Sequence, residues 1–214
     1  MRTFVRQRKN SIKTEKMSSI AKTKDYLVDV AQRLFAQYGK TNVTMNDIAT
    51  ESQKGRRTLY TYFSNKDDIY LAVIKNELAI LREKLEEVTN KDIPPDEKLT
   101  EYIFVRQNAI KDAILRNGSL HADFFRDIYE VQRARRRIDV IEHKIIKKIF
   151  DDGVAQNIFE IEDTNLASLI FLYSLKGIET PFTQKKISNY IEKRHEQIMK
   201  AIFYGIKTSP KKSV

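Results

Sequence analysis

Apolar residues recur at intervals of three and four along most of the chain, which is the repeat of amphipathic α-helices. The first clear stripe begins just after Asp25. Its apolar positions are Leu27, Val30, Ala31, Leu34, Phe35 and Tyr38. Gly39 follows the last of them, where a helix commonly ends in a left-handed residue. No segment shows the alternation of a β-strand, so we predict an all-α protein of about nine helices.

Two short helices separated by a tight turn come next. Residues 44–47 have the pattern of a capping box, in which the Thr44 hydroxyl accepts an early amide and Asp47 reaches back. The helix that starts there is soon interrupted at 53–55, and a third helix is expected over 56–62. Two short helices joined by such a turn, packed under a preceding amphipathic helix, describe a helix-turn-helix.

Longer helices fill the rest of the chain. They are expected from 64 to 88 and over 96–116, 119–130, 134–151, 163–180 and 184–205. The helix over 163–180 is apolar almost all round, so we expect it to be buried on several sides. The last two are more apolar than one small bundle can cover, which favours a helical dimer interface there.

Positive charge is concentrated at the amino end, although the whole chain carries a formal net charge of +10. Residues 1–24 hold eight basic residues and one acid, and the remainder is close to neutral. Residues 1–22 are polar, basic and nearly aperiodic, which predicts a disordered arm with an anionic partner. An arm that only aids solubility, or a natural start at Met17, is an equally open interpretation.

The third helix carries side chains suited to DNA at every position except Leu59. These are Arg56, Arg57, Thr58, Tyr60, Thr61 and Tyr62. Arginines bind guanine edges or phosphates, threonine offers a hydroxyl and a methyl, and tyrosine reaches phosphate oxygens. Lys66 lies where the next helix starts, at a dipole end that favours phosphate. The alternatives are packing tyrosines and a solvated arginine face.

Residues 45–52 and 58–69, preceded by 31–39, resemble the DNA-binding domain of TetR-family transcriptional regulators. The resemblance covers about 25–70 and implies a role for each matching position. Contact with phosphate is implied for Thr44, Tyr60, Tyr62 and Lys66, and a position facing the groove for Arg56, Arg57, Thr58 and Thr61.

Two positions depart from the family pattern. The family usually has glycine in the turn where this chain has Gln53, whereas here glycine comes at Gly55. Glycine or another small residue often stands where this chain has Arg57. The geometry of the turn and the base preference therefore cannot be carried over from relatives.

The resemblance also implies a homodimer that binds a palindromic operator in double-stranded DNA, and a C-terminal domain with a pocket for a small-molecule effector. Aromatic side chains with a few polar groups suit an apolar or aromatic effector. The candidates are Phe104, Asn108, Phe124, Phe125, Tyr129, Phe171 and Tyr173. The alternative is that these residues simply belong to the core. Repression, with release by the effector, is the expected output.

The expected domains are the arm (1–22), the helix-turn-helix domain (23–68), the ligand-binding and dimerisation domain (69–206) and a disordered tail (207–214). The chain has no cysteine, and its three histidines are far apart, so we expect no metal or other cofactor. Neither a phosphate-binding loop nor a nucleophile elbow is present, which argues against an enzyme. With no apolar run of about 18 residues and no secretory signal, a cytoplasmic protein is expected. The competing hypothesis is a basic-armed helical adaptor that binds anionic membrane surfaces or nucleic acid non-specifically.

Overall fold

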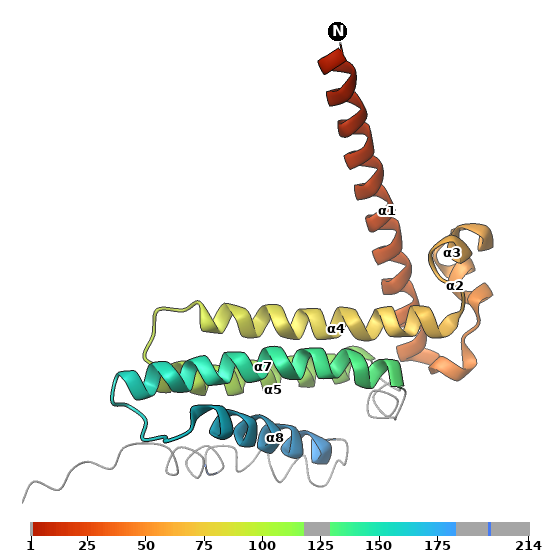
Figure 1. The fold of residues 1–214 in the computed structure, drawn as a ribbon. Helices are drawn as coiled ribbons and strands as arrows, with labels where there is room; N and C mark the ends of the chain where they lie inside the picture. Colours follow the sequence, from red (N-terminus) through yellow and green to blue (C-terminus); the bar gives the residue numbers. More distant parts are fainter. Residues whose placement is uncertain (1, 118–128, 183–196, 198–214) are drawn as a thin grey trace, which may run out of the picture. The chain divides into compact units, whose positions relative to one another are not determined.

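The computed structural model of the protein describes residues 2–117, 129–182 and 197 (Figure 1). Its elements are α1 (Arg2–Tyr38), the short 3-10 helix η1 (Lys40–Asn42), α2 (Met45–Glu51), α3 (Arg56–Tyr62), α4 (Lys66–Thr89), α5 (Pro95–Asn117), α7 (Tyr129–Ala155) and α8 (Thr164–Phe182). The all-α prediction is confirmed. The described residues form seven α-helices and one 3-10 helix rather than about nine helices. The helices expected over 119–130 and 184–205 fall almost wholly outside these residues, as does the tail.

The chain divides into two compact units, which we call the head and the bundle. The head holds residues 1–76 with 114–125, and the bundle holds 77–113 with 126–214. The boundary therefore falls inside α4 rather than at 68/69, where the sequence suggested it. Its first turns belong to the head because their apolar side chains, among them Ile69 and Val73, are buried there.

The first helix is longer than the sequence suggested. Residues 1–22 were expected to form a disordered arm, but α1 is helical from Arg2 without a break (Figure 1). Its 37 residues include neither glycine nor proline, and most are good helix formers. The amino-terminal half of α1 has too few apolar residues to form a core of its own. A helix can still extend into it from the packed segment that follows, because elongation of a helix is easier than its nucleation.

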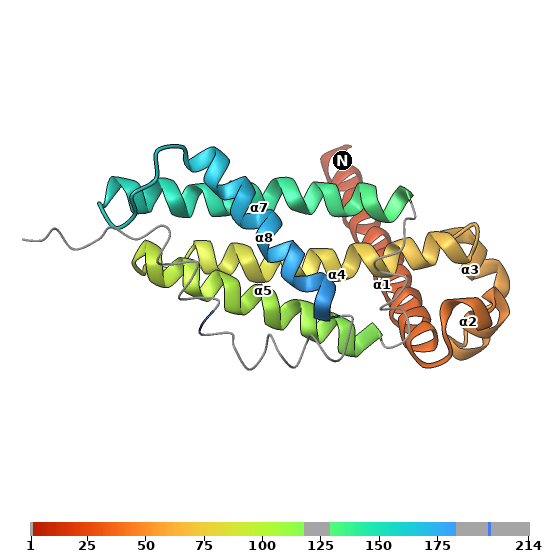
Figure 2. The same cartoon turned by 90° about the horizontal axis from the view of Figure 1, so that it is seen from below.

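The core of the head comes from α1, α2, α3 and the start of α4, which cluster together in Figure 2. Fully buried side chains include Leu27 and Phe35 of α1, Ile48 of α2 and Leu59 of α3. The ring of Phe35 meets that of Tyr70 edge-on, with centroids 6.3 Å apart. This packing holds the two short helices of the helix-turn-helix against α1 and so fixes which side of α3 faces solvent.

The core of the bundle is aromatic at one end. Phe150 meets Phe159 and Phe171 edge-on at 5.9 and 5.5 Å between centroids. Gly153 makes room for this cluster, because a β-carbon there would lie 2.1 Å from the Phe159 ring. No helix among the described residues is both long enough and apolar enough to cross a membrane.

The helix α8 buries only one of its two apolar faces. Phe171, Leu172 and Leu175 lie in the core of the bundle. Leu166, Ile170 and Tyr173 are 54, 59 and 60% exposed. The expectation that this helix is buried on several sides is therefore wrong for the single chain. Its outward stripe has the spacing of one helical face and remains solvent-accessible.

Candidate nucleic-acid interface

The third helix has one buried residue, and that residue orients all the others. Leu59 is fully buried, and Phe63 directly after the helix is 4% exposed. Arg56, Arg57 and Thr61 are exposed, and Tyr60 is 46% exposed. Thr58 and Tyr62 are half-buried at the edges of this face. The sequence therefore folds into a helix with an apolar anchor inside and a surface of cations and hydroxyls outside.

The two arginines of α3 are available to a partner. Within the described part of the chain, no acidic side chain pairs with Arg56 or Arg57 in any recorded salt bridge. Thr61 uses its hydroxyl hydrogen on the Arg57 carbonyl, at 2.9 Å, and keeps its lone pairs and methyl group outward. Exposed guanidinium groups without an internal counter-ion suit phosphates and guanine edges.

The turn between α2 and α3 keeps its left-handed residue without a glycine. Gln53, at the position where the family usually has glycine, has φ 52°. Gly55 has φ −61° and ψ 145°, an extended conformation open to any residue, and it is the N-cap of α3 with no side-chain cap. Gly55 therefore takes the place of a capping serine or threonine, and the strain in the turn lies at Gln53.

The capping box at the start of α2 is confirmed, and it occupies Thr44. The Thr44 hydroxyl accepts from the Asp47 amide and donates to the Asp47 carboxylate, which also accepts the Thr44 amide at 2.8 Å. These hydrogen bonds from the Thr44 backbone and side chain hold the pKa of Asp47 below its ordinary value. A phosphate at Thr44 would meet this carboxylate, which disfavours the contact predicted for Thr44.

Lys66 is engaged inside the head rather than turned to a ligand. Its ammonium donates to the carbonyls of Lys40, Thr41 and Val43, at 2.7, 3.3 and 2.8 Å. An ammonium has three N–H groups, so these contacts use all of them. The phosphate contact predicted for Lys66 has no free donor in this arrangement. The residue instead ties the loop before α2 to the start of α4.

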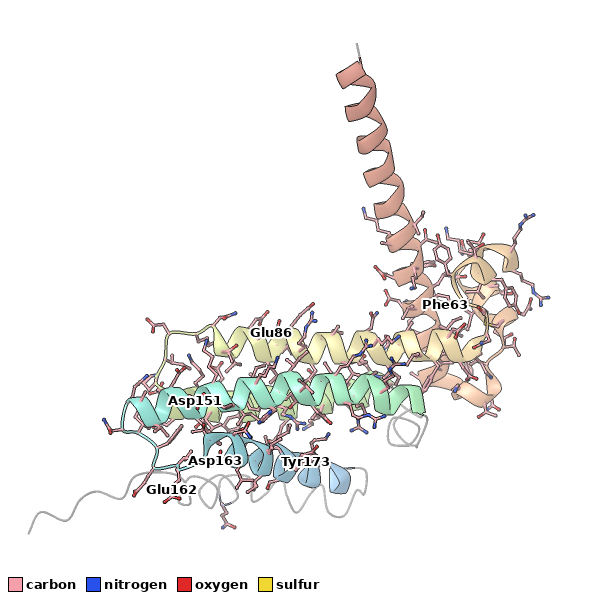
Figure 3. The ribbon with its side chains drawn as sticks, viewed as in Figure 1. Phe63, Glu86, Asp151, Glu162, Asp163 and Tyr173 are labelled. Carbon is pink, nitrogen blue, oxygen red and sulfur yellow. The ribbon has the colours of Figure 1, made fainter. Side chains whose placement is uncertain are left out.

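The sequence analysis missed the position of Lys24. Its ammonium lies 5.6 Å from the centroid of the Phe63 ring. Figure 3 labels Phe63, the residue that follows α3. A cation of α1 is thus placed next to the end of α3. Extending the helical repeat of α1 by one turn toward its amino end would have revealed this, but the sequence analysis began the repeat just after Asp25.

The structure describes only some of the candidate pocket residues, in different surroundings. Phe171 belongs to the aromatic core, whereas Phe104, Asn108 and Tyr173 are exposed. Tyr129 is the first residue of α7. Phe124 and Phe125 lie outside the described residues. The proposed composition of the pocket therefore stays a prediction.

The bundle contains a buried polar trio that the sequence did not suggest. Glu142 of α7 accepts from the Tyr102 hydroxyl at 2.8 Å and from Arg106 Nε at 2.5 Å. Arg106 is 4% and Glu142 2% exposed, and Tyr102 is fully buried. Burial, and then the Glu142 charge, raise the pKa of the Tyr102 hydroxyl well above its ordinary value. Only long-range packing between α5 and α7 brings these three together.

Known proteins resemble the chain in two ways. Residues 27–73 match the family described as bacterial regulatory proteins, tetR family. The HTH-type transcriptional regulator QacR of Staphylococcus aureus is 25% identical over 181 residues, which covers 79% of this chain and 90% of QacR.

Solved structures share the fold. A transcriptional regulator from Cytophaga hutchinsonii superimposes with a TM-score of 0.73 at 22% identity, covering 86% of this chain and 98% of the other. The structure of SmeT in complex with triclosan gives a TM-score of 0.63 at 11% identity, covering 87 and 92%. The matched segment 27–73 spans the helix-turn-helix described above. Residues 27–73 therefore match the tetR family of bacterial regulatory proteins, and the fold of the chain is shared with solved structures of transcriptional regulators.

Proposed function

We propose that the protein is a homodimeric repressor that binds a palindromic operator through α3 and releases it when a small apolar or aromatic molecule binds. The observation that carries the proposal is the outward face of α3. Arg56 and Arg57 lie exposed beside Tyr60 and Thr61, while Leu59 anchors the helix. Base edges are read by Arg56, Arg57, Thr58 and Thr61, and phosphates are contacted by Tyr60 and Tyr62.

The outward stripe of α8 supports a dimer. Leu166, Ile170 and Tyr173 recur at intervals of four and three, and Gly177 continues the series with no atom within 4 Å of an added β-carbon. A second copy laid on this stripe would bury it by two-fold symmetry. Two recognition helices would then sit about 34–36 Å apart, one turn of DNA.

The effector is assigned to the bundle by its chemistry and by a structural neighbour. The core of the bundle includes the rings of Phe150, Phe159 and Phe171, and SmeT, which shares the fold, is in complex with triclosan. Ligand binding shifts operator affinity only as far as the ligand prefers one of the two states of the dimer.

Binding of labelled duplexes from the gene's own promoter region tests the proposal. Nanomolar affinity for one palindrome and a steep salt dependence are expected. Equal, weak binding to every fragment would leave the adaptor hypothesis standing instead. Vesicles of anionic and of neutral lipid, in parallel, show whether the basic end binds membranes.

Light scattering after gel filtration tests the dimer. Ile170→Glu is expected to yield monomers, because it places a charge in the proposed interface. Val140→Glu is the matched control, since Val140 is a 55% exposed apolar residue that belongs to α7 rather than to α8. Equal behaviour of the two variants would count against an interface on α8.

A further inference from the structure

An exposed face of α7 carries a row of cations with one apolar residue in the middle. At about 100° per residue, the members of this row fall within an arc of roughly 80°, and all of them are exposed. They are Arg133, Arg137, Val140, Lys144 and Lys148. We call this surface the α7 basic face. It extends about 22 Å along the helix, or roughly four turns.

The acids of the same segment lie off the face and are paired inside the bundle. Residues 133–148 contain two acids, Asp139 and Glu142, which fall about 140° or more from the centre of the face. Asp139 accepts from the ammonium of Lys176 in α8 at 2.6 Å. Glu142 accepts from Arg106 of α5 at 2.5 Å. Both carboxylates are therefore bonded to cations of other helices and leave the α7 basic face without a counter-charge.

The cations of the face have no acidic partner in any salt bridge recorded for the described residues. Asp151, the next acid in the same register, accepts from Lys147 at 2.6 Å and from Thr164 at 2.5 Å. A pair of like charges four residues apart stands on each side of Val140, and such pairs destabilise a helix slightly. Carboxylates supplied from outside the chain would relieve this repulsion.

Val140 decides which kind of anion fits the face. Its side chain is 55% exposed between the two pairs of cations. A nucleic-acid backbone offers phosphates and sugars at this position and leaves the valine without an apolar contact. A lipid surface holds helices that have a broad apolar face, which a single valine does not provide. A polypeptide can place carboxylates and one apolar side chain in the same row.

We propose that the α7 basic face is a docking surface for an acidic segment of another protein. Carboxylates of the segment pair with the arginines at one end and the lysines at the other, and an apolar side chain covers Val140. The intervals of four, three, four and four residues along the face are those at which a second helix packs on a first. The proposal goes beyond operator and effector binding and depends on neither.

Two synthetic peptides test the apolar contact. Both have 15 residues and are rich in glutamate, one with leucine and the other with alanine at its centre, and fluorescence anisotropy measures their binding to the full chain. The leucine peptide is expected to bind roughly threefold more tightly, because its side chain covers Val140. Val140→Thr keeps the shape of valine but replaces one methyl group by a hydroxyl. It should remove most of this preference.

A pair of charge-matched double variants tests the cations. Arg137→Gln/Lys144→Gln removes two cations from the face, and Arg33→Gln/Lys75→Gln removes two exposed cations of the head. Each pair loses one arginine and one lysine, and glutamine keeps a high helix propensity. The face variant is expected to bind the leucine peptide on the order of fivefold more weakly, and the control less than about twofold.

Carbodiimide coupling locates the bound peptide, since it joins a lysine to a carboxylate in contact with it. Mass spectrometry should find the leucine peptide attached to Lys144 or Lys148 and not to Lys75. Equal losses from the two charge pairs would overturn the proposal, as would equal binding of the two peptides.

The same variants separate other occupants of the face. A random DNA duplex bound more weakly by Arg137→Gln/Lys144→Gln than by the control would assign the face to nucleic acid, and the same result with anionic vesicles would assign it to a membrane. Self-association of the wild-type chain that this variant abolishes would assign it to a second copy. Operator affinity of the variant should equal that of wild type, so failure of the repressor proposal leaves this test unaffected.

Discussion

Arg56 of the head and Arg106 of the bundle carry the same guanidinium group in opposite surroundings. Arg56 is exposed on α3 with no acidic partner in any recorded salt bridge of the described residues. Arg106 is 4% exposed and donates to Glu142 at 2.5 Å. An exposed cation costs the folded chain little and remains available to an anion outside it. A buried one must be paired inside, because an uncompensated charge there is expensive. The comparison separates an arginine that the proposed function uses for binding from one that stabilises the fold.

The largest expected effect is on the buried side of this comparison. Arg106→Met should lower the free energy of unfolding by about 3–5 kcal/mol, since it leaves Glu142 charged and buried without its cation. Urea unfolding followed by circular dichroism measures the loss. The triple variant Tyr102→Phe/Arg106→Met/Glu142→Leu should recover most of it, because Glu142 is then no longer a buried charge without its cation. A triple variant no more stable than Arg106→Met would show that the three residues stabilise the fold beyond the hydrogen bonds that they make to one another.

Replacement of the exposed Arg56 should affect operator binding rather than stability. Arg56→Ala is expected to weaken operator binding by about 1–3 kcal/mol if the side chain reads a base. Unfolding should change by less than about 0.5 kcal/mol, as is usual for surface substitutions. Fluorescence anisotropy with a labelled operator measures the first quantity and urea unfolding the second.

Arg136→Ala is the matched control for Arg56→Ala. Arg136 is an exposed arginine of α7, in the basic cluster at 133–137. Its replacement by alanine should leave both the operator affinity and the free energy of unfolding unchanged. Equal losses of operator affinity from the two variants would remove the distinction between α3 and any other exposed basic surface.

How far the sequence predicted the fold and the site depends on the range of the interactions involved. Local patterns sufficed for α3, for the capping box at Thr44 and for the anchor Leu59. The bonds of Lys66 to carbonyls 23–26 residues earlier could not be predicted, because they require the loop and the start of α4 to be packed together. Glu142 and its two partners are likewise 36–40 residues apart. Helical register predicts which residues share one face of a helix, whereas tertiary packing decides which other residues that face contacts.

Lys66 extends the comparison, because it is a cation of the head whose donors, like those of Arg106 in the bundle, are bonded inside the fold. Lys66→Met should lower the free energy of unfolding by about 1–3 kcal/mol, since three backbone carbonyls lose a charged donor. Any loss of operator affinity should come without the smaller salt slope that removal of a phosphate contact produces. A salt slope lower by about 0.9 at unchanged stability would restore the phosphate contact predicted from the sequence.

The smallest expected effect concerns the turn that aims α3. Gln53 has φ 52°, where a side chain costs about 1–2 kcal/mol relative to glycine. About 0.4–1 kcal/mol of this gain is offset, because glycine raises the conformational entropy of the unfolded chain. Gln53→Gly should therefore raise the free energy of unfolding by roughly 0.5 kcal/mol.

Operator affinity of Gln53→Gly should stay within about twofold of wild type, because φ is already at the value that glycine favours and α3 need not move. Gly153→Ala is the opposing control in the bundle, where the added β-carbon would collide with Phe159 and cost about 1–3 kcal/mol. If Gln53→Gly instead lowers both stability and affinity, the glutamine side chain itself holds the turn. The departure from the family's glycine would then be part of how this head positions Arg56 rather than a tolerated strain.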